Sequence, residues 1–191
     1  PVLFLGSLTM GVYMFFWLEG AKLVTPGESS ILISTSAIWA LFFEAAFRLK
    51  KLRWQSVVGG AISSVGVALV VGHSSGTSTL TGVFMTLAAA VLWGLCVVIA
   101  RILGRHFSPL QLLTLSLPGA LVVLIPYGLQ PALAVDWSKF SPSDWYYFFH
   151  LALLAGAIGF FGFYKGVDQI GAGQAMRYQF FVPVVAVVSA F

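Results

Sequence analysis

Hydroxyl and aromatic side chains recur at helical spacing within apolar stretches of the sequence. Ser30 and Ser34 are four residues apart, as are Tyr13 and Trp17, so each pair would share one face of a helix. Hydroxyls in such stretches either hydrogen-bond to the protein itself or line a wet cavity. Aromatic rings there either pack and anchor helices or stack on an organic, aminated solute. Packing or anchoring is favoured for Trp39, Trp54, Trp137 and Trp145.

Ionisable side chains inside apolar stretches form a second group of candidates, because a charge within a bilayer is costly and is retained mainly for function. His150 lies inside the outer end of a predicted span, where an imidazole could exchange a proton coupled to transport. An interfacial histidine with satisfied polar atoms is the alternative. Glu44 precedes Arg48 by four residues, which favours an ion pair at the cytoplasmic surface.

Charged and amide side chains also gather around the last predicted linker. Lys165 and Asp168 are three residues apart and are expected to pair near the cytoplasmic mouth. Arg177 and Gln179 open the last apolar segment, where they could bind a substrate carboxylate. For Arg177, a plain anchoring role on the cytoplasmic side stays equally open.

Motifs typical of enzymes and ATP-driven pumps are absent from the sequence. It has no phosphate-binding P-loop, no Cys and His cluster with metal-ligand spacing, and no Ser-His-Asp or paired-carboxylate set within lipid depth. We therefore predict no catalytic residue, no cofactor and no metal site. The single cysteine, Cys96, is expected to be a packing residue. A membrane-embedded enzyme and a structural membrane subunit stay open as interpretations of this chain.

The composition of the chain predicts a membrane protein. Of its 191 residues, 59% are apolar or aromatic and 8% are charged, whereas about a quarter are charged in typical soluble domains. A mean hydropathy of +0.96 implies more apolar surface than a core of this length could bury. In this setting the net charge of +4 indicates orientation in a membrane and no nucleic-acid partner.

Seven apolar segments are long enough for helices that cross a bilayer core of about 30 Å. Three of these helices are expected to start at Thr25, Ser108 and Ser141, because each hydroxyl precedes a proline and a side chain that can complete a capping box. The chain is expected to be a piece of a longer membrane protein. The predicted spans are 2–19, 26–47, 54–72, 80–101, 108–129, 144–166 and 173–191.

Lysines and arginines are distributed unevenly between alternate linkers. Lys22 and Lys139 lie on one side of the predicted membrane, and eight cations lie on the other. Because cytoplasmic loops are enriched in these residues, the cation-rich side is predicted to be cytoplasmic, with Pro1 on that side of the inner membrane. The eight cations are Arg48, Lys50, Lys51, Arg53, Arg101, Arg105, Lys165 and Arg177.

Small residues at four-residue spacing predict close helix packing in two of the spans. In the span 80–101 they are Gly82, Thr86, Ala90 and Gly94. In the span 54–72 they are Gly60, Ser64 and Ala68.

A weak internal repeat relates the first two predicted spans to the last two. The shift that places Gly27 on Gly173 also places Gly20 on Gly166. The two copies begin an odd number of spans apart, so the second would be inverted in the membrane relative to the first. Inverted repeats are common in secondary transporters, whose halves rock around a site at the membrane midplane.

Three pairs of stretches carry a resemblance to a known family. They are AAVLWG at 89–94 with SPLQ at 108–111, VVGG at 57–60 with VGVAL at 65–69, and GVDQIGAGQA at 166–175 with FVPV at 181–184. In their order and spacing, these stretches resemble the EamA-like branch of the drug/metabolite transporter superfamily, over essentially the whole chain.

The resemblance implies an all-α polytopic membrane protein of ten helices, arranged as two inverted halves of five around a central cavity. Residues 1–72 would supply the last three helices of the first half, 73–79 an external linker, and 80–191 the first four helices of the second half, truncated at the C-terminus. The chain would thus hold seven of the ten transmembrane helices. The positions that the resemblance places at the cavity are Tyr13, Trp17, Trp93 and Tyr164.

The chain departs from the family pattern at two places. Ala37 stands where the family has a proline, whereas the equivalent Pro183 in the second half is present and is expected to be a hinge. We therefore expect the span around Ala37 to be straighter. Leu49 and Lys50 replace a Gly-Glu pair at the end of that span.

Together, the residues and the resemblance predict a secondary transporter that works by alternating access. Its expected substrates are small organic metabolites such as amino acids, amines or related compounds, with efflux as the direction. The predicted partners are this small-molecule substrate and the lipid bilayer, without nucleic acid, and a homodimer is a further option.

Overall fold

The described part of the chain is helical. The computed structural model describes residues 2–51, 54–55, 58–59, 62, 65–66, 69 and 78–182, and no strand occurs among them. These residues form an all-α fold, as expected for a polytopic membrane protein. The number of spans and the two inverted halves stay predictions. The described helices long and apolar enough to cross a membrane are Pro26–Ala46, Leu80–Leu103, Pro109–Ala134 and Pro142–Ile170.

Two of the predicted features lie wholly or mostly outside the described residues. Most of the span 54–72, with its small-residue strip, lies outside the described residues. The expected hinge Pro183 also lies outside them.

The second predicted span consists of two helices, α2 (Pro26–Ser34) and α3 (Ser36–Ala46), separated at Thr35. Thr35 itself keeps a helical backbone, with φ −63° and ψ −17°, so α2 and α3 continue as the apolar helix Pro26–Ala46, and the expectation that this span is straighter stays a prediction. The Thr35 hydroxyl donates to the Leu32 carbonyl at 2.7 Å, and the Thr35 backbone N–H donates to the same carbonyl at 3.1 Å. Both bonds reach back three residues, so the helix tightens locally at Thr35, and hydroxyls that bond to the preceding turn favour such a change.

The three predicted helix starts are confirmed. At Thr25, Ser108 and Ser141 the hydroxyl accepts from the backbone N–H three residues later, and the side chain of that later residue accepts from the N–H of the cap. These capping boxes satisfy donors that would otherwise be orphaned at the first turn. They begin α2, α6 (Pro109–Ala134) and α7 (Pro142–Phe149).

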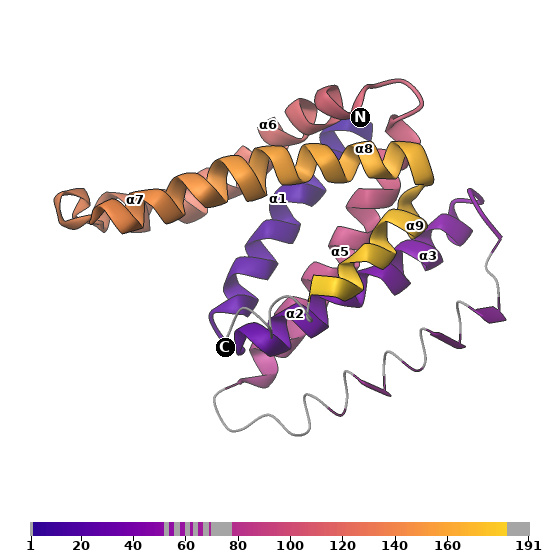
Figure 1. The fold of residues 1–191 in the computed structure, drawn as a ribbon, viewed down its shortest axis with the longest axis horizontal. Helices are drawn as coiled ribbons and strands as arrows, with labels where there is room; N and C mark the ends of the chain where they lie inside the picture. The colour runs from indigo at the N-terminus through magenta and orange to yellow at the C-terminus, as the bar shows by residue number, and fades with distance from the viewer. Residues whose placement is uncertain are drawn as a thin grey trace.

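Two further helices and a long rod complete the described structure. α1 (Val2–Ala21) precedes α2, and α5 (Leu80–Leu103) precedes α6, which η1 (Trp137–Lys139) connects to α7. From α7 the chain continues through the π-helical η2 (His150–Gly159) into α8 (Phe160–Ile170), and these three elements form one rod along an edge of the molecule (Figure 1).

The chain turns sharply after the rod. Gly171 has a φ of +86°, a conformation that glycine adopts without the steric cost of a Cβ. The turn leads into α9 (Ala172–Ala175) and η3 (Met176–Phe180), which run beside α2 and α3 (Figure 1).

Helix α5 lies at the centre of the fold, between α1 on one side and α3 on the other. Its small-residue strip allows backbones to approach closely: a Cβ on Gly94 would lie 2.9 Å from the Ala40 nitrogen, and a Cβ on Gly82 would lie 2.9 Å from the Leu23 carbonyl oxygen. Thr86, in the same strip, is fully buried. The close packing predicted for this strip is therefore confirmed.

Linkers predicted on the same side of the membrane meet in the structure. At one end, the Thr79 N–H donates to the Leu23 carbonyl at 3.0 Å, and the Lys22 ammonium donates to Glu19 at 2.6 Å and to the Tyr127 hydroxyl at 2.7 Å. These bonds, with Glu19 as the larger contribution, raise the pKa of Lys22. α3, α5 and α8 end together at the opposite side. Which end faces the cytoplasm stays a prediction.

The contact between α1 and α6 provides a test of this packing. A Cβ on Gly119 would lie 2.5 Å from the Leu8 backbone nitrogen, whereas Gly128 on the same helix has open space around it. Gly119→Ala should therefore destabilise the full-length protein by about 1–3 kcal/mol through overpacking. Gly128→Ala should be neutral or slightly stabilising, because alanine favours a helix. Thermal unfolding in detergent measures both, and equal melting temperatures would contradict the packing.

Candidate functional site

Glu44, near the end of α3, is a buried carboxylate with 1% of its surface exposed. Its Oε1 atom accepts from the Arg101 guanidinium in α5 and from the Gly173 backbone N–H at 3.2 Å. The predicted pair with Arg48 is wrong. Because α3 ends at Ala46 and Arg48 has a φ of +57°, residues 44 and 48 no longer share a helical face.

Gly173 allows the start of α9 to lie directly against the Glu44 carboxylate. A Cβ at this position would lie 2.7 Å from Glu44 Oε2 and 2.9 Å from Leu41 Cδ2. Within the described residues, Oε2 itself has no hydrogen-bond partner. The weak internal repeat in the sequence aligns Gly27 with Gly173 and so drew attention to this glycine. No local pattern in the sequence predicts that Glu44 pairs with a residue of α5.

A cavity of about 430 Å³ lies beside this ion pair, at the ends of α5 and α8. Its size is within the range of small-molecule sites, roughly 300–1,000 Å³. Arg101 and Arg105, which belong to the cation-rich predicted side, line it. The sequence predicted the side of the membrane on which these arginines lie, but it did not predict the cavity. The polar side chains that line it are Arg101, Arg105, Tyr164, Asp168 and Gln169.

Asp168 does not make the predicted ion pair with Lys165 anywhere in the described part of the chain. Both side chains are exposed, and Asp168 lines the cavity instead. The turn at Gly171 directly follows and brings the end of α8 against Arg101, which is a tertiary contact.

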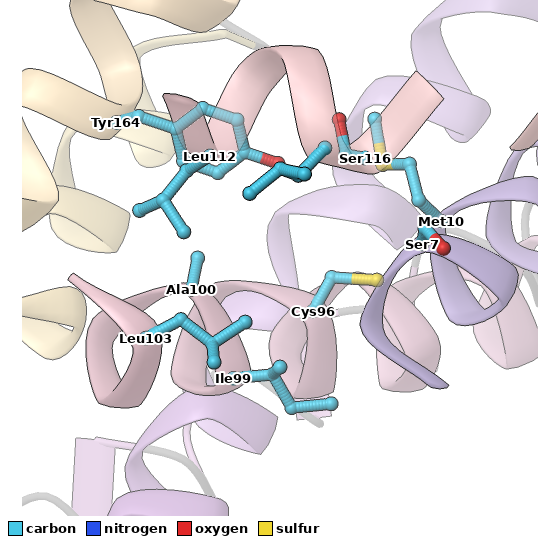
Figure 2. Close-up of a pocket in the computed structure, with 10 residues that line it drawn as sticks. Ser7, Met10, Cys96, Ile99, Ala100, Leu103, Leu112, Ser116 and Tyr164 are labelled. Carbon is cyan, nitrogen blue, oxygen red and sulfur yellow. The ribbon is translucent and has the colours of Figure 1, made fainter. Parts of the chain in front are cut away.

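A second, smaller pocket of about 30 Å³ lies deeper between α1, α5, α6 and α8, with room for about one water molecule. Figure 2 shows the side chains that line it, with the Tyr164 ring beside Leu112 and its hydroxyl directed toward Ser116 of α6. Cys96 lines this pocket and is buried, as expected for a packing residue. Ala100, Leu112 and Tyr164 line both cavities, so they form the wall between them.

The predicted aromatic residues gather on α1, α5 and α8. The Tyr13 ring stacks on Trp93 with centroids 5.0 Å apart, and Trp93 contacts Phe163 at 5.3 Å. Trp93 and Tyr164 are each 4% exposed, and Trp17 packs against the same core. Of the predicted aromatic residues, only Tyr164 lines a cavity in the described structure; the others pack against neighbouring side chains.

The predicted serines bond to the protein itself. Ser30 donates to the Gly27 carbonyl at 2.7 Å, and Ser34 donates to the Ser30 carbonyl at 2.7 Å. Gln179 of η3 lies beside them: its backbone carbonyl is 3.2 Å from the Ser34 hydroxyl, and its side-chain oxygen accepts from Ser36 at 2.8 Å. These bonds join the second predicted span to the start of the seventh, whose described residues run antiparallel to it.

A comparison of the sequence with models of known protein families identifies the family of this chain. A model of the EamA-like transporter family matches residues 1–72 and 80–191. The chain belongs to the EamA-like transporter family. No solved structure matches this EamA-like chain.

Curated relatives of the chain carry transporter names. The chain is 28% identical to "Uncharacterized transporter YetK" of Bacillus subtilis, over 98% of this chain and 58% of the relative. It is 25% identical to the "Probable terminal-alkyne amino-acid exporter" of Streptantibioticus cattleyicolor, over 97% of this chain and 62% of the relative. The chain thus spans about three fifths of the length of these relatives.

The remaining predicted site residues of this EamA-like chain lie away from the cavities. His150 is exposed at the start of η2, with its ring 6.0 Å from that of Tyr146, and Arg177 is exposed on η3. Neither lines a cavity in the described structure. Their roles stay predictions. Among the described residues, no group of three His, Cys, Asp or Glu side chains is placed to hold a metal ion.

The corrected pairing of Glu44 gives a direct test. Glu44→Gln removes the charge that Arg101 neutralises, and should lower the unfolding free energy of the full-length protein by roughly 2–3 kcal/mol. The loss should fall below that of a fully buried pair because the Arg101 side chain is 31% exposed. The control is Arg48→Asn, which removes the charge of the partner that the sequence predicted for Glu44. It should leave the unfolding free energy unchanged. Denaturation in detergent measures both variants, and a comparable loss in Arg48→Asn would restore the local pair.

Proposed function

We propose that the full-length protein is a secondary transporter that moves small organic metabolites, such as amino acids, amines or related compounds, across the cytoplasmic membrane, with efflux as its direction. Membership of the EamA-like transporter family and the transporter names of its relatives support this proposal. The name of one relative, a probable terminal-alkyne amino-acid exporter, supports an amino acid as the first substrate to test.

The observation that carries the proposal is the pair of adjoining cavities. The larger one, at the cation-rich end, accepts polar groups, and the smaller one continues toward the aromatic core behind a wall that includes Tyr164. A solute that entered from the cation-rich end would meet charged side chains first and the mostly apolar lining of the smaller pocket, with Tyr164, next. This order suits an organic molecule that has a charged head and an apolar body.

Alternating access between two inverted halves is the proposed mechanism. The antiparallel course of α2 and α3 beside α9 and η3 supports it, as does the separate match of the family model to 1–72 and 80–191. The far end of the described bundle is joined by the bonds of Lys22, Glu19 and Tyr127. We infer a state that is open at the cation-rich end, which we assign to the cytoplasm together with residue 1. A homodimer stays a further prediction.

Transport can be measured as counterflow of labelled L-propargylglycine, a terminal-alkyne amino acid, in proteoliposomes of the full-length protein. Trp93→Ala should reduce counterflow about tenfold or more, because it removes the ring that stacks on Tyr13 and supports α8. Trp39→Ala is the matched control: Trp39 is 38% exposed, and alanine keeps the Cβ that packs near Gly94. Equal counterflow in both variants would contradict the proposed path, and consumption of the probe without counterflow would favour an enzyme.

Proton coupling through His150 is a separate part of the proposal. If the imidazole exchanges the coupled proton, His150→Ala should transport L-propargylglycine at a rate that no longer depends on an imposed pH gradient. Vesicles with defined internal and external pH provide this measurement. If the transport rate of His150→Ala still depends fully on the pH gradient, the coupled proton does not pass through His150.

A further inference from the structure

Arg101 presents an unused edge of its guanidinium beside the larger cavity. Within the described residues, its Nη1 atom bonds to Glu44, and neither Nε nor Nη2 has a hydrogen-bond partner. This edge lies against Gly171: Nη2 and Nε are 3.6 and 3.8 Å from the place that a Cβ on Gly171 would occupy. The Nε and Nη2 donors of arginine form a planar fork that matches the two oxygens of a carboxylate.

Arg105 and Asp168 line the same cavity, Arg105 from the turn that follows α5 and Asp168 from α8. Neither side chain makes a hydrogen bond or an ion pair with any other described residue. The charged side chains that line the cavity are therefore Arg101, Arg105 and Asp168, and the buried Glu44, which pairs with Arg101 and does not line the cavity, brings the sum of these charges to zero. Counted with Glu44, the empty cavity is thus neutral overall, and a ligand with one charge of each sign would keep it so.

We propose that this cavity is a binding site for the charged head of a zwitterionic α-amino acid, at the cation-rich entrance of the transporter. The free edge of Arg101 and the Arg105 guanidinium bind the carboxylate, and Asp168 binds the ammonium group. The proposal rests on the proposed function for its choice of solute, and it adds a site that is separate from the aromatic residues at the core. Tyr164, which lines both cavities, then lies where the head group ends and the side chain of the solute begins.

The site is coupled to the ion pair through Arg101. One edge of this guanidinium holds Glu44, which contacts Gly173, and the other edge binds the solute. A carboxylate on the free edge competes with Glu44 for the same positive charge. Binding therefore weakens the contact between α3, α5 and α9, which joins the second and seventh predicted spans.

An anionic lipid head group is the other ligand with matching chemistry, because phosphate also binds arginine forks. Asp168 argues against it: a phosphate would leave this neutral cavity with a net negative charge and would lie near a carboxylate that it cannot pair. A zwitterion satisfies all three unpaired groups. The test below includes lipid composition for this reason.

Binding of three probes to the full-length protein in detergent tests the site independently of transport. L-propargylglycine carries both charged groups, 4-pentynoic acid lacks the ammonium, and 3-butynylamine lacks the carboxylate. Arg105→Gln should weaken L-propargylglycine and 4-pentynoic acid about tenfold or more and leave 3-butynylamine unchanged. Asp168→Asn should weaken L-propargylglycine and 3-butynylamine and should not weaken 4-pentynoic acid. Arg101→Lys keeps the charge beside Glu44 but loses the fork, and should weaken both carboxylate probes.

Two exposed lysines outside the cavity provide matched controls. Lys50→Gln removes a cation from the same end of the protein, and Lys165→Gln lies on α8 one turn before Asp168. Both should bind all three probes as the wild type does. Equal losses in these controls would show that general surface charge attracts the probes and would overturn the site.

The remaining outcomes separate this site from the proposed function. Counterflow of L-propargylglycine by the wild type, with unchanged affinity in Arg105→Gln and Asp168→Asn, overturns the site and leaves the transporter intact. Binding with the predicted probe pattern but no counterflow supports the site and contradicts the transport proposal. Absence of binding to the wild type overturns the site. Binding that disappears when phosphatidylglycerol is added, with no effect of Asp168→Asn, assigns the arginines to lipid.

Discussion

The bond from Arg101 to the buried Glu44 carboxylate is the interaction on which the described arrangement depends. A charge removed from water is tolerated only with a partner, and Glu44 has both the Arg101 guanidinium and the Gly173 N–H. These contacts hold the ends of α3 and α5 and the start of α9 together. A side chain at position 173 would displace the carboxylate, so glycine and the ion pair require each other.

The same arginine connects packing with function. Its Nη1 atom belongs to the ion pair, whereas its other edge lies at the polar cavity. Deeper in the bundle the lining of the smaller pocket is mostly apolar, with Tyr164 in the wall between the two cavities, and the stacked rings of Trp93 and Tyr13 belong to the packed core. The change from a charged to a mostly apolar lining between the two adjoining cavities is the feature that most supports the proposed transport of an amphipathic organic solute.

Local features of this fold could be read from the sequence because they depend on neighbouring residues. Capping at Thr25, Ser108 and Ser141 involves groups three residues apart, and the small-residue strip of α5 has a four-residue period. The tight turn at Thr35 was not anticipated, although the run of hydroxyls around it is visible in the sequence. The aromatic candidates were identified by type, and the structure shows that Tyr13, Trp93 and Tyr164 lie on neighbouring helices.

The sequence by itself determined that the chain is a helical membrane protein, where several helices start, and which family it resembles. These properties follow from composition and from short periodic patterns. Only the tertiary structure decided that Glu44 pairs with Arg101, that Asp168 faces a cavity, and that Tyr164 separates two cavities. The reason is physical: a buried charge selects its partner by proximity in space, and a turn such as that at Gly171 brings together residues whose separation along the chain carries no local signal.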